Sequence, residues 1–234
     1  MQAGSGDDNP IASGAKAYTP ALGSAPMRLY DLALRIFTRE QAWRAAVLRQ
    51  LAPIAGEKLI GVGCGTGTLI LAIARLQPAA RTFGRDPDPE ALQMARSKAE
   101  KAGIATEFRL GFADETAAQG QFGALTCTLV LHQIPLAGKR AALAAMFAAL
   151  EPGGRLVIAD YSLQRSWLMR TLFRLKVQRI DGRADTQPNA DGILPRLIEE
   201  AGFVDVNEAA IVATPSGSIS VFTACRAPFG PTAR

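Results

Sequence analysis

Three glycines at alternate positions are the residues best placed to build a ligand site. Gly63, Gly65 and Gly67 lie in the run Lys58-Leu-Ile-Gly-Val-Gly-Cys-Gly-Thr-Gly-Thr68, which starts as an apolar segment and ends where a helix is expected. Glycine lets a backbone turn tightly and approach a ligand that leaves no room for side chains. The spacing does not give G-x-G-x-x-G, which disfavours a nicotinamide dinucleotide.

An acidic residue, Asp86, follows Gly67 after nineteen residues, at the end of the strand-like segment 82–85. A carboxylate at the end of a neighbouring strand can accept hydrogen bonds from both hydroxyls of a ribose. The glycine run and Asp86 together predict an adenosine-containing ligand across the ends of two strands. For Asp86 alone, the alternative is an N-cap for the helix that follows.

The elements that would position these residues alternate along the chain. Strands are expected at 58–62, 82–85, 106–110, 124–130 and 155–159, and helices at 28–51, 66–76, 89–102 and 139–150. Parallel strands need such crossover helices, so the fold class is a doubly wound α/β sheet. After a helix at 193–201, the strands at 204–211 and 218–225 are joined by a short turn, which predicts an antiparallel edge hairpin.

Composition excludes several classes of protein and site. The 234 residues are 48% hydrophobic and 20% charged, as in a globular domain. One histidine, His132, and three widely spaced cysteines leave no metal site to predict. Neither G-x-S-x-G nor a P-loop motif occurs. No apolar run is long enough to span a membrane and no leader is evident, so we expect a cytoplasmic protein.

Several ordered motifs between Thr19 and Cys225 carry a family resemblance: G-V-G-C-G-T-G, G-R-D-P-D-P-E-A-L, L-V-L-H-Q-I-P, L-E-P-G-G-R-L-V-I-A-D and E-A-G-F. In these motifs the sequence resembles the class I S-adenosylmethionine (SAM)-dependent methyltransferases, and within them the ubiquinone/menaquinone-biosynthesis group. The resemblance implies an enzyme with a mostly parallel, Rossmann-like seven-stranded sheet, an antiparallel C-terminal strand, SAM as cofactor and S-adenosylhomocysteine as product.

The resemblance also implies roles for single residues. Those expected to bind the cofactor are Tyr30, Gly63, Cys64, Gly65, Thr66, Gly67, Asp86, Pro87, Phe112, Ala113, Cys127 and Thr128. In this assignment Asp86 holds the ribose, and Phe112 and Ala113 form the adenine rim. Family members often have acidic residues where this chain has Gly61, Phe112 and Gly123, so we expect weak SAM affinity.

The acceptor side is expected near His132, the candidate catalytic residue, which would act as a base or orient the acceptor. The alternative is that His132 caps or packs the following turn. Tyr18, Asp160 and Tyr161 are the candidate acceptor-binding residues. For Asp160 and Tyr161 the alternative is an ordinary turn at a strand end, and for Tyr18 it is plain packing.

A basic stretch at 165–183 carries six arginines and lysines against one acidic residue, Asp181, and so matches the +5 charge of the whole chain. Trp167 and other apolar residues interrupt it. This pattern predicts either a lid over the substrate or an amphipathic segment on an anionic membrane. Nucleic acid is not an expected partner, because the basic residues are confined to one region.

These observations predict a lead-in at 1–26, a helical cap at 27–57, a methyltransferase domain at 58–226 with a lid insertion at about 162–191, and a tail at 227–234. The expected activity is methyl transfer to a small hydrophobic acceptor. The alternatives are a membrane-surface lipid or quinone-precursor methyltransferase, and a SAM-binding regulatory or auxiliary protein without turnover. The acceptor, the methylated atom and the oligomeric state stay open.

Overall fold

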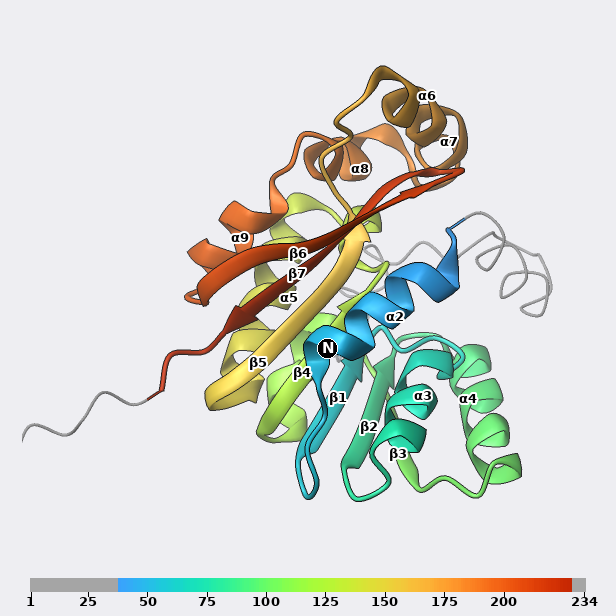
Figure 1. Ribbon diagram of the computed structural model, residues 1–234, viewed down its shortest axis with the longest axis vertical. Coiled ribbons are helices and arrows are strands. Elements are labelled where there is room, and N and C mark those ends of the chain that lie inside the picture. The colour runs from blue at the N-terminus through green and yellow to red at the C-terminus, as the bar shows by residue number, and fades with distance from the viewer. Residues whose placement is uncertain (1–37, 229–234) are drawn as a thin grey trace, which may run out of the picture.

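The computed structural model describes residues 38–228, which form a seven-stranded sheet between two layers of helices (Figure 1). The strand order is β3-β2-β1-β4-β5-β7-β6. The strands are β1 (Lys58–Val62), β2 (Arg81–Asp86), β3 (Thr106–Leu110), β4 (Phe122–Thr128), β5 (Leu150–Tyr161), β6 (Val204–Thr214) and β7 (Gly217–Cys225). Strands β1 to β5 pair in parallel, while β7 runs antiparallel to β5 and β6. The predicted fold class is confirmed.

Helices cover both faces because alternate residues of each strand point to opposite sides. One layer contains α2 (Glu40–Leu51), α3 (Thr68–Leu76) and α4 (Pro89–Lys101), and the other contains α5 (Leu136–Ala149) and α9 (Leu194–Glu200) (Figure 1). Two adjacent residues of β1 illustrate the alternation. Leu59 is buried in the core that includes Trp43 of α2, and Ile60 in the core that includes Leu143 of α5.

The strand order reverses between β1 and β4, since β2 and β3 extend the sheet one way and β5 the other. Open α/β sheets bind ligands at such a reversal, in the crevice at the carboxyl ends of the strands. The glycine loop joins β1 to α3 at this edge. Short 3-10 helices, η2 (Ala113–Gln119) and η3 (Leu131–Gln133), follow β3 and β4 there.

The helical insertion, residues 162–193, separates β5 from α9 and carries α6 (Trp167–Lys176), α7 (Gln178–Asp181) and α8 (Arg183–Ala190). It forms the end of the molecule drawn at the top of Figure 1. None of the helices within 38–228 has the length and apolar character needed to span a bilayer. The predicted lead-in, Tyr18 and Tyr30 lie outside the described residues, as do parts of the predicted cap and tail.

Candidate functional site

The three glycines after β1 all adopt positive φ values, of 65° for Gly63, 52° for Gly65 and 75° for Gly67. A Cβ atom on Gly63 would lie 2.1 Å from Val130 Cγ2, and one on Gly67 would lie 2.9 Å from Ala95 Cβ. A Cβ on Gly65 would meet nothing within 4 Å. Gly63 and Gly67 therefore allow close packing, whereas Gly65 leaves open space above the loop.

Asp86 ends β2 and is hydrogen-bonded to the glycine loop. Its Oδ2 accepts from the Gly65 backbone N–H at 2.7 Å, and its Oδ1 accepts from the Asp88 N–H at 2.9 Å. Burial raises the pKa of Asp86, and the two N–H groups act in the opposite direction. The α4 N-cap is Asp88, which accepts from Glu90 and Ala91, so the alternative reading of Asp86 as that cap is wrong.

These residues fit an adenosine-containing cofactor. A carboxylate offers about four acceptor positions, and the backbone takes two of those on Asp86, which leaves capacity for ribose hydroxyls. The open space at Gly65 lies on the loop that Asp86 holds in place. The end of β3 lies close to Asp86 as well, because the N–H of Gly111, which follows β3, donates to the Asp86 carbonyl oxygen at 3.1 Å.

The other predicted cofactor residues differ in what their side chains reach. Burial and the neighbouring Asp86 raise the pKa of the Cys64 thiol, so it is not a ready nucleophile. Thr66 is 5% exposed and accepts from Lys98 Nζ. Cys127 is fully buried beside β1. The remaining residues, Pro87, Phe112, Ala113 and Thr128, are half-buried at the ends of β2, β3 and β4.

The acceptor-side candidates are joined in a buried network. His132 Nδ1 lies 2.7 Å from Asp160 Oδ1, and His132 Nε2 lies 3.4 Å from Asp181 Oδ2. Asp160 also accepts from the backbone N–H groups of Val130 and Leu131. Since Asp160 is fully buried and occupied in this way, the geometry favours a structural role for it over contact with an acceptor.

Tyr161 completes the aromatic side of this network. Its ring packs edge-to-face on His132 with centroids 5.0 Å apart, and its hydroxyl pairs with Ser216 Oγ at 2.6 Å. On its other side, the Phe173 ring of α6 lies 5.3 Å away. Tyr161 is 5% exposed, so it packs in the core between β5 and the helical insertion.

The sequence analysis missed Lys139, which is fully buried on α5. Its Nζ donates to the carbonyl oxygens of Leu131, Ile134 and Asp185, at 2.5, 2.6 and 2.8 Å. Burial lowers its pKa to about 8. A signal existed, because Lys139 lies one helical turn before Leu143 on the buried face of an alanine-rich helix.

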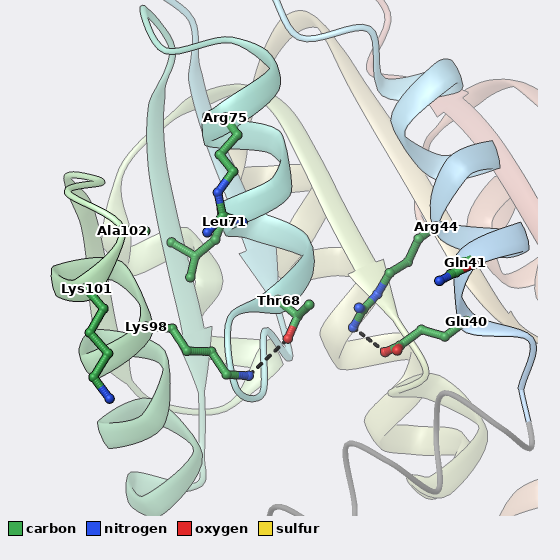
Figure 2. A pocket seen from close by; sticks show the side chains of 9 residues that line it. All are labelled: Glu40, Gln41, Arg44, Thr68, Leu71, Arg75, Lys98, Lys101 and Ala102. Carbon is green, nitrogen blue, oxygen red and sulfur yellow. Dashed lines mark hydrogen bonds and ion pairs between the residues drawn. The ribbon is translucent and has the colours of Figure 1, made fainter.

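A hollow of about 750 Å³ lies between α2, α3 and α4 and adjoins the glycine loop, since its lining residue Lys98 also donates to Thr66 (Figure 2). Its lining is Glu40, Gln41, Arg44, Thr68, Leu71, Arg75, Lys98, Lys101 and Ala102. Figure 2 shows Lys98 turned toward Thr68, whose Oγ1 accepts from Lys98 Nζ at 3.1 Å. The hollow thus borders the outer side of α3, behind the glycine loop.

Comparison with known proteins gives consistent matches. The family model described as a methyltransferase domain matches residues 60–154. Demethylmenaquinone methyltransferase from Thermus thermophilus is 30% identical over 156 residues, which are 64% of this chain and 69% of that protein. The enzyme of the same name from Deinococcus radiodurans is 29% identical over 154 residues, 64% of this chain and 63% of that protein.

Solved structures support the fold. An O-methyltransferase family protein from Burkholderia thailandensis has a TM-score of 0.68 at 16% identity, covering 86% of this chain and 59% of that one. Magnesium protoporphyrin IX methyltransferase from Synechocystis PCC 6803 has a TM-score of 0.64 at 18% identity, covering 81% and 84%. This chain thus spans less than two thirds of the Deinococcus and Burkholderia proteins. Given the Thermus match and this agreement in fold, the chain belongs to the class I SAM-dependent methyltransferases, in the menaquinone- and ubiquinone-biosynthesis group.

Proposed function

We propose that the protein transfers a methyl group from SAM to a small hydrophobic acceptor and releases S-adenosylhomocysteine. The hydrogen bond from the Gly65 N–H to Asp86 carries this proposal, because it holds the glycine loop and the ribose-binding carboxylate together at the reversal of the sheet. When bound, SAM supplies an electrophilic methyl group on its sulfonium. The loop backbone and Asp86 then orient the cofactor, and the helical insertion shields the sheet edge from water.

The acceptor class follows from the state of His132. A carboxylate faces each ring nitrogen of His132, and this arrangement favours the protonated ring over a free base that could take a proton from the acceptor. This favours acceptors that lose a proton readily without it, such as phenols and quinols. Relatives named demethylmenaquinone methyltransferase and ubiquinone biosynthesis O-methyltransferase support an aromatic acceptor of this kind.

Calorimetric titration with SAM tests the cofactor placement. We expect Asp86→Ala to weaken SAM binding ten- to a hundredfold, because hydrogen bonds to a charged group contribute about 1.5–3 kcal/mol each. Glu100→Ala removes an exposed carboxylate from α4 and is the matched control. Equal affinity in Asp86→Ala and the wild type would remove the placement.

Turnover separates the enzyme from its rival, a SAM-binding regulatory or auxiliary protein. Purified protein is incubated with SAM and a panel of phenols, quinols and amines, and S-adenosylhomocysteine is measured. Product formation with a phenol or quinol supports the proposal. Tight SAM binding without product from any acceptor favours the rival.

A second candidate function, methylation of a lipid or quinone precursor at a membrane surface, has its own support in the insertion. Phe173 is the buried residue of α6, whereas Trp167 is 78% exposed, Leu168 45% and Leu175 54%. Exposed arginines at 174, 179 and 183 lie in the same stretch. Apolar side chains beside cations fit an anionic bilayer surface, so in this version the protein is membrane-peripheral.

Vesicle co-sedimentation tests this second function. We expect retention on vesicles of phosphatidylcholine with phosphatidylglycerol, little on phosphatidylcholine alone, and release as salt rises. Arg174→Glu should weaken retention severalfold, while Arg81→Glu, which makes the same charge change at the opposite end of the sheet, should not. If the anionic vesicles do not retain the wild type, the proposal that the protein acts at a membrane surface is wrong.

A further inference from the structure

Two buried basic side chains lie where the helical insertion meets the carboxyl end of β5. His132 of η3 and Lys139 of α5 are 5% and 0% exposed. Each contacts the sheet-side elements and a helix of the insertion: His132 reaches Asp181 of α7, and Lys139 reaches the Asp185 carbonyl of α8. Both contacts join segments more than forty residues apart in the sequence. The insertion is thus held by these charged contacts together with the buried ring of Phe173 and hydrogen bonds such as that from Asn189 Nδ2 to the Tyr161 carbonyl oxygen.

Asp160 is the fixed end of this arrangement. Its Oδ2 accepts from the Val130 N–H at 3.1 Å and the Leu131 N–H at 2.7 Å, and its Oδ1 accepts from the Tyr161 N–H at 2.7 Å. His132 Nδ1 contacts the same Oδ1 at 2.7 Å. With three backbone donors, the carboxylate is held in one orientation and so aligns the His132 ring.

The free end is Asp181, the last residue of α7, whose side chain is 14% exposed. Gly182 follows with a φ of 80°, and the chain turns into α8 there. A neutral imidazole has one N–H, whereas contacts with Asp160 and Asp181 call for a donor on each nitrogen. The geometry is therefore that of an imidazolium between two carboxylates.

We infer that His132 is a positioning residue: its imidazolium, between Asp160 of β5 and Asp181 of α7, fixes the helical insertion against the sheet edge and does not serve as a general base. This inference concerns the protein without ligand, so it stands or falls independently of SAM binding.

The surrounding charges support this assignment. Burial alone would lower the pKa of His132, but Asp160 and Asp181 outweigh it and hold that pKa at about 9. The other titratable groups here are Tyr161 on β5, the buried thiol of Cys127 on β4, and Lys139 on α5, with Asp185 of α8 near Lys139. The two cations face three carboxylates, which keeps the His132 charge favourable.

The test uses the fact that the chain has a single histidine. With ¹⁵N-labelled histidine, both ring nitrogens are followed by NMR from pH 6 to 10 without any assignment step. We expect both to be protonated at pH 7.5, with a midpoint near pH 9. Asp181→Asn should lower that midpoint, while Glu100→Gln, an exposed carboxylate change on α4, should leave it in place. A neutral imidazole at pH 7.5 in the folded wild type overturns the inference.

Hydrogen exchange gives the second readout. Asp181→Asn removes one charge at the edge of the network. It therefore tests the contact between His132 and Asp181 without leaving a cavity in the core. We expect amide exchange in residues 178–190 to rise at least tenfold, with no change in α3. His132→Asn keeps a donor toward Asp160 but not toward Asp181, and should have the same effect. Unchanged protection of 178–190 in a folded Asp181→Asn protein overturns the positioning role.

Discussion

At the scale of single residues, neighbouring glycines meet different steric demands. Gly63 has no room for a methyl group beside Val130, and Gly65 has a positive φ but open space. Gly61, in β1, has neither constraint, since a Cβ there would lie 3.6 Å from its nearest neighbours. Alanine substitutions along the run therefore separate folding from binding.

We expect Gly65→Ala to lower the free energy of unfolding by only about 1–2 kcal/mol, the cost of a left-handed alanine, while weakening SAM binding tenfold or more. Gly63→Ala combines the same strain with a clash and should cost about 2–4 kcal/mol. Gly61→Ala is the control and should change neither. Chemical denaturation and calorimetry make the comparison. If Gly65→Ala binds SAM normally, the open space above the loop is not the cofactor site.

At the scale of elements, two aspartates two residues apart have different tasks. Asp86 holds the glycine loop, whereas Asp88 caps α4 by accepting from Glu90 and Ala91 at 2.8 and 3.2 Å. The sequence pointed only to Asp86 as the alternative N-cap, because Asp86 lies ahead of Pro87 and Pro89. The hydrogen bonds assign the cap to Asp88.

We expect Asp88→Ala to lower the free energy of unfolding by about 1 kcal/mol, the usual cost of losing an N-cap, and to change SAM affinity less than Asp86→Ala does. Thermal denaturation and calorimetry on the two variants measure both effects. Glu100→Ala in the same helix is again the control. A larger loss of SAM affinity in Asp88→Ala than in Asp86→Ala would contradict this division of tasks.

Sequence periodicity located most elements, since strands 58–62 and 106–110 have the predicted bounds. It placed the start of β5 at 155 instead of Leu150, because Gly153 and Gly154 read as a turn, while Leu150 already pairs with Phe122 before a register shift. For the basic stretch at 165–183 the sequence predicted a lid or an amphipathic segment but no helix bounds. The stretch contains two short helices, α6 and α7, and the second ends where Gly182 adopts a positive φ.

At the scale of the whole molecule, the pairing of charges could not be predicted from spacing. His132, Asp160 and Asp181 are separated by 28 and 21 residues and meet only because η3, β5 and α7 converge. The sequence offered His132 as a base, and the structure surrounds it with carboxylates. Contacts of this kind depend on the tertiary fold. The glycine loop, in contrast, is formed by neighbouring residues and could be predicted from the sequence.

Stability against pH should carry the signature of this network. The pKa of His132 is about 9 in the folded chain against an ordinary 6.5, so its stabilisation is full below about pH 6.5 and is lost as pH rises through 9. The free energy of unfolding of the wild type should be higher than that of His132→Asn, and we expect this difference to be up to about 3 kcal/mol larger at pH 6 than at pH 9.5. Urea denaturation at the two pH values measures it.

Lys139 acts with the opposite sign. Burial lowers its pKa to about 8, so its contribution to stability rises between pH 8 and 10.5 in both proteins and cancels in the difference. A difference between wild type and His132→Asn that does not vary with pH would mean that His132 is neutral in the folded chain.

The position of β7 between β5 and β6 has a consequence for folding. Within residues 38–228, β6 pairs with β7 alone, yet the ribosome delivers β6 first. Any folding intermediate in which β7 has not yet paired exposes the outer edge of β5 and leaves β6 unpaired, and both edges are templates for aggregation.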